Sequence, residues 1–92
     1  MKFISTWTIQ PGNVNPAIER FLKTGGAAPD GVKILGRWFG MDGRAFAVSE
    51  ATDAKAMYKW YAEWADLLDL TVTPCVEDAE AGEVLVARAA QR

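Results

Sequence analysis

Hydrophobic and polar positions follow two different spacings along this chain. Four short segments are rich in aromatic and β-branched residues or alternate between apolar and polar positions, which predicts strands at 2–9, 32–40, 44–51 and 68–77. Met41-Asp42-Gly43 separates the second and third segments and predicts a tight antiparallel hairpin. Because Pro74 cannot donate to a neighbouring strand, it indicates either a sheet edge or the end of a strand.

Two other segments carry apolar residues at the spacing of a helix face. In the first, Asn15 suits the N-cap position and Pro16 suits the first helical position. Gly25 and Gly26 end this helix, because glycine tolerates the left-handed conformation at a helix C-terminus. Its apolar stripe is formed by Ala17, Ile18, Phe21 and Leu22.

The second helix begins after a cap at Thr52 or Asp53 and extends to about Asp66. Its spacing predicts a broad apolar stripe that is made by Met57, Trp60, Tyr61, Trp64, Leu67 and Leu68. The aromatic members of this stripe are interpreted as core or interface residues rather than as a ligand-stacking site.

The tail that starts at Asp78 opens with acidic residues and closes with Arg88 and Arg92. This polarity matches the helix dipole and predicts a third helix. The predicted order is therefore β-α-β-β-α-β with an extra C-terminal helix, the order of the ferredoxin-like fold. Right-handed crossovers place the first two helices on one face of a four-stranded sheet. We expect residues 1–92 to form one α+β domain whose other sheet face is uncovered.

The residues expected on this uncovered face are small, hydroxylated and partly apolar. The first, third and last strands contribute Ile4, Thr6, Thr8, Ala45, Ala47, Ser49, Thr71 and Thr73. The second strand has two possible phases, which place on this face either Leu35, Arg37 and Phe39 or Ile34, Gly36 and Trp38. A mixed face of this kind suits contact with a second copy, so we predict a homodimer with two sheets face to face.

Composition and charge narrow the choice of partners. Half of the 92 residues are apolar and four are Trp, which is a high apolar content for a small domain. This content favours a partner that covers some of the apolar surface. The net charge of −2 and the scattered basic residues argue against nucleic-acid binding. The sequence contains no bilayer-length apolar run and no recognisable signal peptide, so we expect no membrane association and a cytoplasmic location.

The chain contains no histidine and a single cysteine, Cys75. This removes the usual general base, the common nucleophile pairs, most zinc sites and the commonest haem ligand, so we expect neither a metal nor a cofactor. Cys75 is interpreted as a small buried residue. Glu63 and Asp66 form either a solvated helix face or an acid–base pair. No residue is assigned a catalytic role.

Three segments, STWTIQPG, ERFLKTGGAAPDGVKILGRWFG and WYAEWADLLDLTVTPCVEDAEAGEVL, cover most of the chain. Together they resemble a family of small bacterial proteins described as a domain of unknown function, within the dimeric α/β-barrel superfamily of ferredoxin-like fold. The resemblance implies a homodimer and no established activity. Relatives carry His where this chain has Phe39, so a role for that imidazole cannot operate here. Enzymes among more distant barrel proteins are an analogy of fold alone.

Arg37 is unusual because it lies in an apolar strand, where a charge needs a partner. That partner is either the carboxylate of a ligand or a protein carboxylate such as Glu50, which alternatively pairs with Arg44. Two functional classes follow: a small-molecule binder or weak enzyme with an apolar pocket at the sheet, and a non-catalytic dimerisation module. The candidate ligand-binding residues are Thr6, Thr8, Arg37, Trp38, Ser49 and Thr73.

Overall fold

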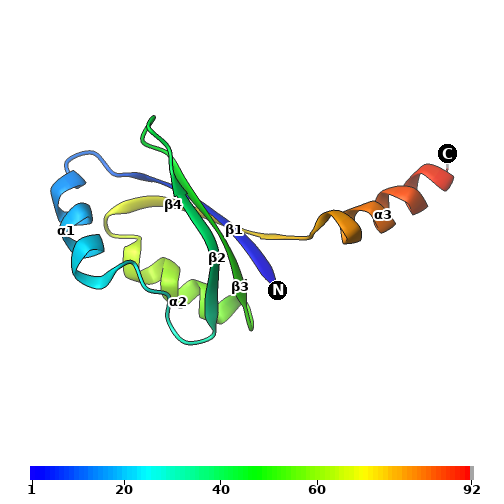
Figure 1. Cartoon of the computed structure of the whole chain (residues 1–92), viewed down its shortest axis with the longest axis horizontal. Coiled ribbons are helices and arrows are strands. Elements are labelled where there is room, and N and C mark those ends of the chain that lie inside the picture. Colours follow the sequence, from blue (N-terminus) through cyan, green and yellow to red (C-terminus); the bar gives the residue numbers. More distant parts are fainter. Residues whose placement is uncertain (92) are drawn as a thin grey trace.

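The computed structural model describes residues 1–91 (Figure 1). Its elements are β1 (Lys2–Ile9), α1 (Val14–Thr24), β2 (Val32–Phe39), β3 (Ala45–Ala51), α2 (Ala54–Trp64), β4 (Leu68–Cys75) and α3 (Asp78–Ala90). This order confirms the predicted α+β, ferredoxin-like fold with an extra C-terminal helix. Arg92, which the prediction included in the tail helix, lies outside the described residues.

The four strands form one antiparallel sheet in the order β2-β3-β1-β4. β4 lies at a sheet edge, one of the two positions that Pro74 indicated, because the nitrogen of Pro74 needs no partner on the open side. The hairpin between β2 and β3 is closed by a backbone hydrogen bond from Gly40 to the carbonyl of Arg44 at 2.7 Å. Asp42 also accepts a hydrogen bond from the Arg44 backbone within this turn, which confirms the predicted turn.

Strand register determines which side chains face the helices. Ser5 of β1 pairs with Ala47 of β3 and with Val72 of β4, so these three share one face. Alternation places on the same face Phe3, Trp7, Ala45, Ser49, Ala51, Leu68 and Leu70. The prediction that Ala45, Ala47 and Ser49 lie on the uncovered face was therefore wrong, because pairing with β1 sets the phase of β3.

The second strand follows neither of its two predicted phases throughout. Ile34 pairs with Ser49, whereas Arg37 pairs with Ala47, and the register shifts between Ile34 and Gly36. This β-bulge puts both Ile34 and Arg37 on the helix side of the sheet. Gly36 has a specific role there, since a Cβ at this position would collide with the ring of Trp38.

We call the sheet face opposite α1 and α2 the bare face. It includes Ile4, Thr6, Thr8, Gly36, Trp38, Phe46, Val48, Thr71, Thr73 and Cys75, and the charged residues Lys2, Lys33, Glu50 and Asp69 lie at its margins. Its apolar members are exposed, with 40% for Ile4, 52% for Trp38 and 45% for Phe46. The rings of Trp38 and Phe46 stack with centroids 5.1 Å apart. No helix within residues 1–91 packs on this face.

The predicted start of α1 was wrong by two residues. Asn13 is the N-cap residue, and its carbonyl accepts the first helical hydrogen bond from Ala17. Pro16 is thus the third helical residue, a position at which a backbone N–H would have no partner within the helix. The second helix agrees with its prediction, because Asp53 caps it by accepting a hydrogen bond from the backbone of Ala56 at 2.9 Å.

The hydrophobic core consists of two small clusters between the helices and the sheet. Phe3, Ala51 and Met57 form the first, beneath α2. Ala17, Leu67 and Leu68 form the second, where α1 and the end of α2 meet β4. α1 packs less closely on the sheet than α2 does. Both helices lie on one sheet face, as predicted, and space remains between the clusters.

α1 is held to the rest of the protein by an ion pair. The guanidinium of Arg20 binds both carboxylate oxygens of Asp66 at 2.8 Å and donates to the backbone carbonyl of Glu63 at 2.8 Å. Its charge also lies 5.4 Å from the centre of the Trp64 ring. The hydrogen bonds from Arg20 lower the pKa of the Asp66 carboxyl below its usual value.

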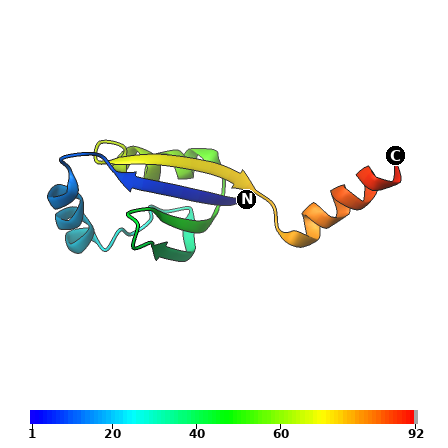
Figure 2. The same ribbon diagram turned by 90° about the horizontal axis from the view of Figure 1, so that it is seen from above.

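α3 makes no such contact with the rest of the domain, and none of its residues is buried. Figures 1 and 2 show it projecting away from the sheet, at the opposite end of the molecule from α1. A capping box between Glu77 and Glu80 starts this helix, and Gly82 does not interrupt it.

We predict that Arg20→Gln destabilises the protein in a pH-dependent manner. Because the pKa of Asp66 is lowered in the folded state, the ion pair stabilises the fold above the unfolded pKa of about 3.9 and loses this effect as pH falls through the folded pKa. The urea midpoint of the variant should lie below that of the wild type at about pH 6, and the gap should narrow towards about pH 2.5 to what the contacts of Arg20 with Glu63 and Trp64 contribute.

Lys23→Gln is the matched control, since Lys23 lies on the same helix and forms no ion pair within residues 1–91. It should leave the midpoint unchanged at both pH values. A gap between Arg20→Gln and wild type that does not vary with pH would show that Asp66 is not the relevant partner.

Candidate functional site

A pocket of about 430 Å³ lies between α1, α2 and the helix side of the sheet. We call it the helix–sheet pocket. Its lining is almost entirely apolar and includes the aromatic residues Trp7, Phe21, Phe39, Trp60, Tyr61 and Trp64. The pocket exists because the two core clusters are separate and because the sheet offers a small residue, Ala45, at its floor.

Aromatic side chains from different elements meet at the α1 end of this pocket. The ring of Phe39 on β2 contacts Trp7 on β1 edge to face, with centroids 6.1 Å apart. It contacts Phe21 on α1 in the same manner at 5.6 Å. These contacts are the packing that aromatic rings prefer, and they hold α1 at a distance from the sheet.

The charged residues of the pocket are all basic. Arg37 and Arg44 are the charged side chains in the lining, and no Asp or Glu within residues 1–91 contributes to it. Arg44 lies at the exposed hairpin, where Asp42 binds it at 2.7 Å and neutralises its charge. That contact lowers the pKa of the Asp42 carboxyl. Arg37 has no carboxylate partner within residues 1–91, so its positive charge is uncompensated.

The guanidinium of Arg37 is fixed by backbone carbonyls at the end of α1. It donates hydrogen bonds to Gly26 at 2.8 Å and to Gly25 at 3.0 Å, where the helix dipole favours a cation. It also lies over the ring of Phe21, 5.1 Å from the centroid. Gly26 is required for this approach, because a Cβ there would lie 2.8 Å from Nη1 of Arg37 and its φ is +60°.

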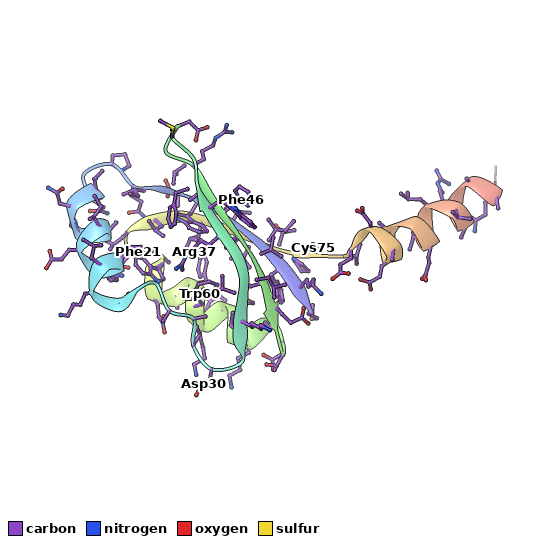
Figure 3. All side chains as sticks on the ribbon, in the orientation of Figure 1. Phe21, Asp30, Arg37, Phe46, Trp60 and Cys75 are labelled. Atoms are coloured by element: carbon purple, nitrogen blue, oxygen red, sulfur yellow. The ribbon has the colours of Figure 1, made fainter. Side chains whose placement is uncertain are left out.

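Figure 3 shows that Phe21, Arg37 and Trp60 lie around one space, although they come from α1, β2 and α2. The two bonds to carbonyls use two of the five N–H groups of the Arg37 guanidinium. The other N–H groups have no hydrogen-bond partner within residues 1–91, and a planar guanidinium is well suited to binding a carboxylate. The site therefore combines an aromatic pocket with a cation that is already held in place.

The structure does not bring the six predicted ligand-binding residues together. Arg37 lines the helix–sheet pocket, but Thr6, Thr8, Trp38 and Thr73 lie on the bare face. Thr6 and Thr8 border a separate hollow at one end of the sheet, together with Asp42, Asp69 and Thr71. Ser49 is fully buried beside Phe3 and Ile34 and lines neither hollow.

The structure also corrects the predictions for Glu50 and Cys75. Glu50 pairs with the N-terminal amine at 3.0 Å and with Lys2 at 3.3 Å, not with Arg37 or Arg44. Cys75 was interpreted as buried, but it is half-exposed on the bare face because no helix covers that face.

Of the two interpretations of Glu63 and Asp66, a solvated helix face or an acid–base pair, the contacts of Asp66 argue against the second. Asp66 is bound by Arg20, so it is not a free acid or base, and it does not line the helix–sheet pocket. No group of three His, Cys, Asp or Glu side chains within residues 1–91 is placed to hold a metal ion.

Sequence reasoning missed most of the pocket lining, although it identified the residues as apolar. Phe21, Trp60 and Trp64 were assigned to core stripes, and Phe39 was not given a role in a site. A usable signal was present, because the facing strand carries only the small residues Ala45, Ala47 and Ser49 at these positions. Large aromatic residues on two helices that face small residues on a strand indicate a space between the helices and the sheet that the side chains do not fill.

Comparison with known proteins identifies the family of this chain. The family model described as "Domain of unknown function (DUF3303)" matches residues 1–89. Because the match spans nearly the whole sequence, the chain belongs to this family, whose description names no activity. No curated protein and no solved structure matches the chain. No helix within residues 1–91 has the length and apolar character needed to span a membrane.

We predict that Ser49→Ala raises stability. The Ser49 hydroxyl is completely buried and has no hydrogen-bond partner within residues 1–91, so removing it relieves a desolvation cost of about 1 kcal/mol. Urea denaturation should show a higher midpoint with an unchanged slope. A clear loss of stability in the variant would show that the hydroxyl has a hydrogen-bond partner after all.

Proposed function

We propose that this member of the DUF3303 family binds a small, mainly apolar molecule that carries one carboxylate, in the helix–sheet pocket. The uncompensated charge of Arg37 within an aromatic lining is the observation that carries this proposal. Ligand pockets in proteins are mostly apolar, with a few placed polar groups that fix orientation. A volume of about 430 Å³ falls within the usual range for such pockets.

The charge pattern supports an anionic ligand over a neutral or cationic one. A cationic ligand would meet Arg37 and Arg44 with no carboxylate in the lining to balance it. A neutral apolar ligand would bury Arg37 without a counter-charge, which is costly in an apolar site. A carboxylate would accept hydrogen bonds from the remaining guanidinium N–H groups and would neutralise the charge of Arg37.

The proposed role is binding, and any reaction would depend on the ligand's own reactivity. The lining supplies the hydroxyls of Ser5 and Tyr61 and the two arginines, but no histidine or carboxylate base. These groups are suited to orienting a ligand rather than to removing a proton from it.

The proposal is tested by comparing decanoate with 1-decanol, which share an apolar chain and differ in the carboxylate. Calorimetric titration of the wild type should give at least about tenfold tighter binding of decanoate, from a charge-assisted hydrogen bond to Arg37. Arg37→Gln should lose this preference, while 1-decanol still binds and reports an intact pocket.

Arg44→Gln serves as the control, because Arg44 is neutralised by Asp42 at the exposed hairpin. It should retain the preference for decanoate. Equal affinity of the wild type for both compounds would remove Arg37 from the site, and the failure of both compounds to bind would refute the pocket as a binding site.

We propose dimerisation through the bare face as a second role. The observation that favours it is the exposure of the stacked pair Trp38 and Phe46, together with Ile4, on a sheet face without a covering layer. A sheet with an apolar face must bury that face against another layer. The same face of a second copy would supply this layer in a two-fold arrangement, which is the commonest form of homo-oligomer.

For this second role, we predict that Phe46→Asp dissociates the dimer. Light scattering of the wild type should give about twice the chain mass of 10.1 kDa, and the variant should raise the dissociation constant by about 100-fold or more. Val14→Asp is the control, since Val14 is 51% exposed on α1, away from the bare face. A wild type that remains monomeric at every concentration would contradict this role.

A further inference from the structure

α3 departs from the compact form of the rest of the chain. It follows β4 after the two residues Val76 and Glu77, and it has no buried residue. Figures 1 and 2 both show it extending beyond the end of the sheet. The radius of gyration is consequently 15.8 Å, compared with about 12 Å for a compact domain of this length.

The start of this helix is fixed by specific contacts. The side chain of Glu77 accepts from the backbone of Glu80, while the side chain of Glu80 accepts from the backbone of Glu77 at 3.3 Å. Lys2 of β1 forms an ion pair with Glu77, which ties the beginning of α3 to the sheet. The position at which α3 starts is therefore fixed by residues within this chain.

Local contacts alone are insufficient to stabilise α3. Isolated helices shorter than about 12–15 residues are marginal in water, and α3 has 13 residues, with Gly82 among them. Its central residues are three consecutive aliphatic side chains, Val84, Leu85 and Val86, with exposures of 67%, 64% and 72%. A helix with this composition needs an apolar surface beyond its own chain.

The chain exposes more surface than a compact protein of its mass, and the excess is large enough to supply a dimer interface. The accessible surface is 6623 Å², whereas a compact protein of 10.1 kDa exposes about 5,300 Å². The excess of about 1,300 Å² exceeds the roughly 800 Å² that each partner buries in a standard interface. Six of the fifteen large apolar residues that are exposed lie on α3 or on the bare face, which are Ile4, Trp38, Phe46, Val84, Leu85 and Val86.

We propose that α3 is an arm that packs the helix side carrying Val84 and Leu85 against a second copy of this chain, beside the paired bare faces. This inference rests on the proposed dimer. α3 follows directly after β4, the strand that forms one edge of the bare face, so the helix begins next to that face. In a two-fold dimer each copy supplies both an arm and a receiving surface, so no third protein is needed to cover either.

Hydrogen exchange as a function of protein concentration tests this arm directly. Since α3 has no contact within its own chain that buries it, its backbone amides should be protected only in the dimer. Amides of residues 82–90 should exchange slowly at high concentration and at rates close to those of an unfolded peptide after dilution. Phe46→Asp should show the fast rates at every concentration.

Leu85→Asp separates the arm from the sheet pairing. It should raise the dimer dissociation constant by about tenfold or more in sedimentation velocity, whereas Val14→Asp should leave it within about twofold. The variant cannot unfold the domain through lost core packing, because Leu85 is exposed in the single chain. A circular dichroism melt equal to that of the diluted wild type checks this.

The possible failures are distinguishable. A dimer whose α3 amides exchange freely, and which Leu85→Asp does not weaken, would overturn the arm and leave the sheet pairing intact. A monomer at all concentrations would overturn both proposals. A monomer with protected α3 amides would overturn the arm by assigning α3 to a surface of its own chain.

Discussion

The hydrogen bonds from Arg37 to the carbonyls of Gly25 and Gly26 determine how the helix layer sits on the sheet. They join the middle of an edge strand to the end of α1, and the ring of Phe21 lies against the same guanidinium. At the other side of α1, Arg20 binds Asp66. Two polar anchors thus fix a helix whose apolar stripe is not closed against the sheet. The helix–sheet pocket and its uncompensated charge both follow from this arrangement.

Much of the fold was predictable because the local signals agree with one another. Alternation in β1 and β4, the turn at 41–43, the cap at Asp53 and the glycines after α1 all indicate the same element order. The face of β3 was not predictable from hydrophobicity, since its bulky residue Phe46 faces outward and its small residues face the helices. Only pairing with β1 decides this phase. The bulge in β2 had a signal in Gly36, an isolated glycine within a strand.

The candidate site was less predictable than the fold because it depends on contacts between distant segments. Arg37 was recognised as unusual, yet its backbone partners lie 11 and 12 residues away, in a turn without any charged group. The threonines were grouped with Arg37 on the assumption of a single strand phase. The bulge separates them, so that Thr6, Thr8 and Thr73 belong to the bare face. The two sides of the sheet therefore suit different proposed roles, ligand binding on one and assembly on the other.

The central claim is that Arg37 holds a carboxylate inside an apolar pocket. The pKa of decanoate labelled with ¹³C at its carboxyl, measured by NMR in the bound and the free state, tests this claim most directly. Pairing with a fixed guanidinium lowers the pKa of a carboxyl, whereas burial in an apolar site without a partner raises it. We predict a lower pKa for bound decanoate than for free decanoate. A raised pKa would contradict the account, because it would show that the carboxylate enters the protein without meeting Arg37.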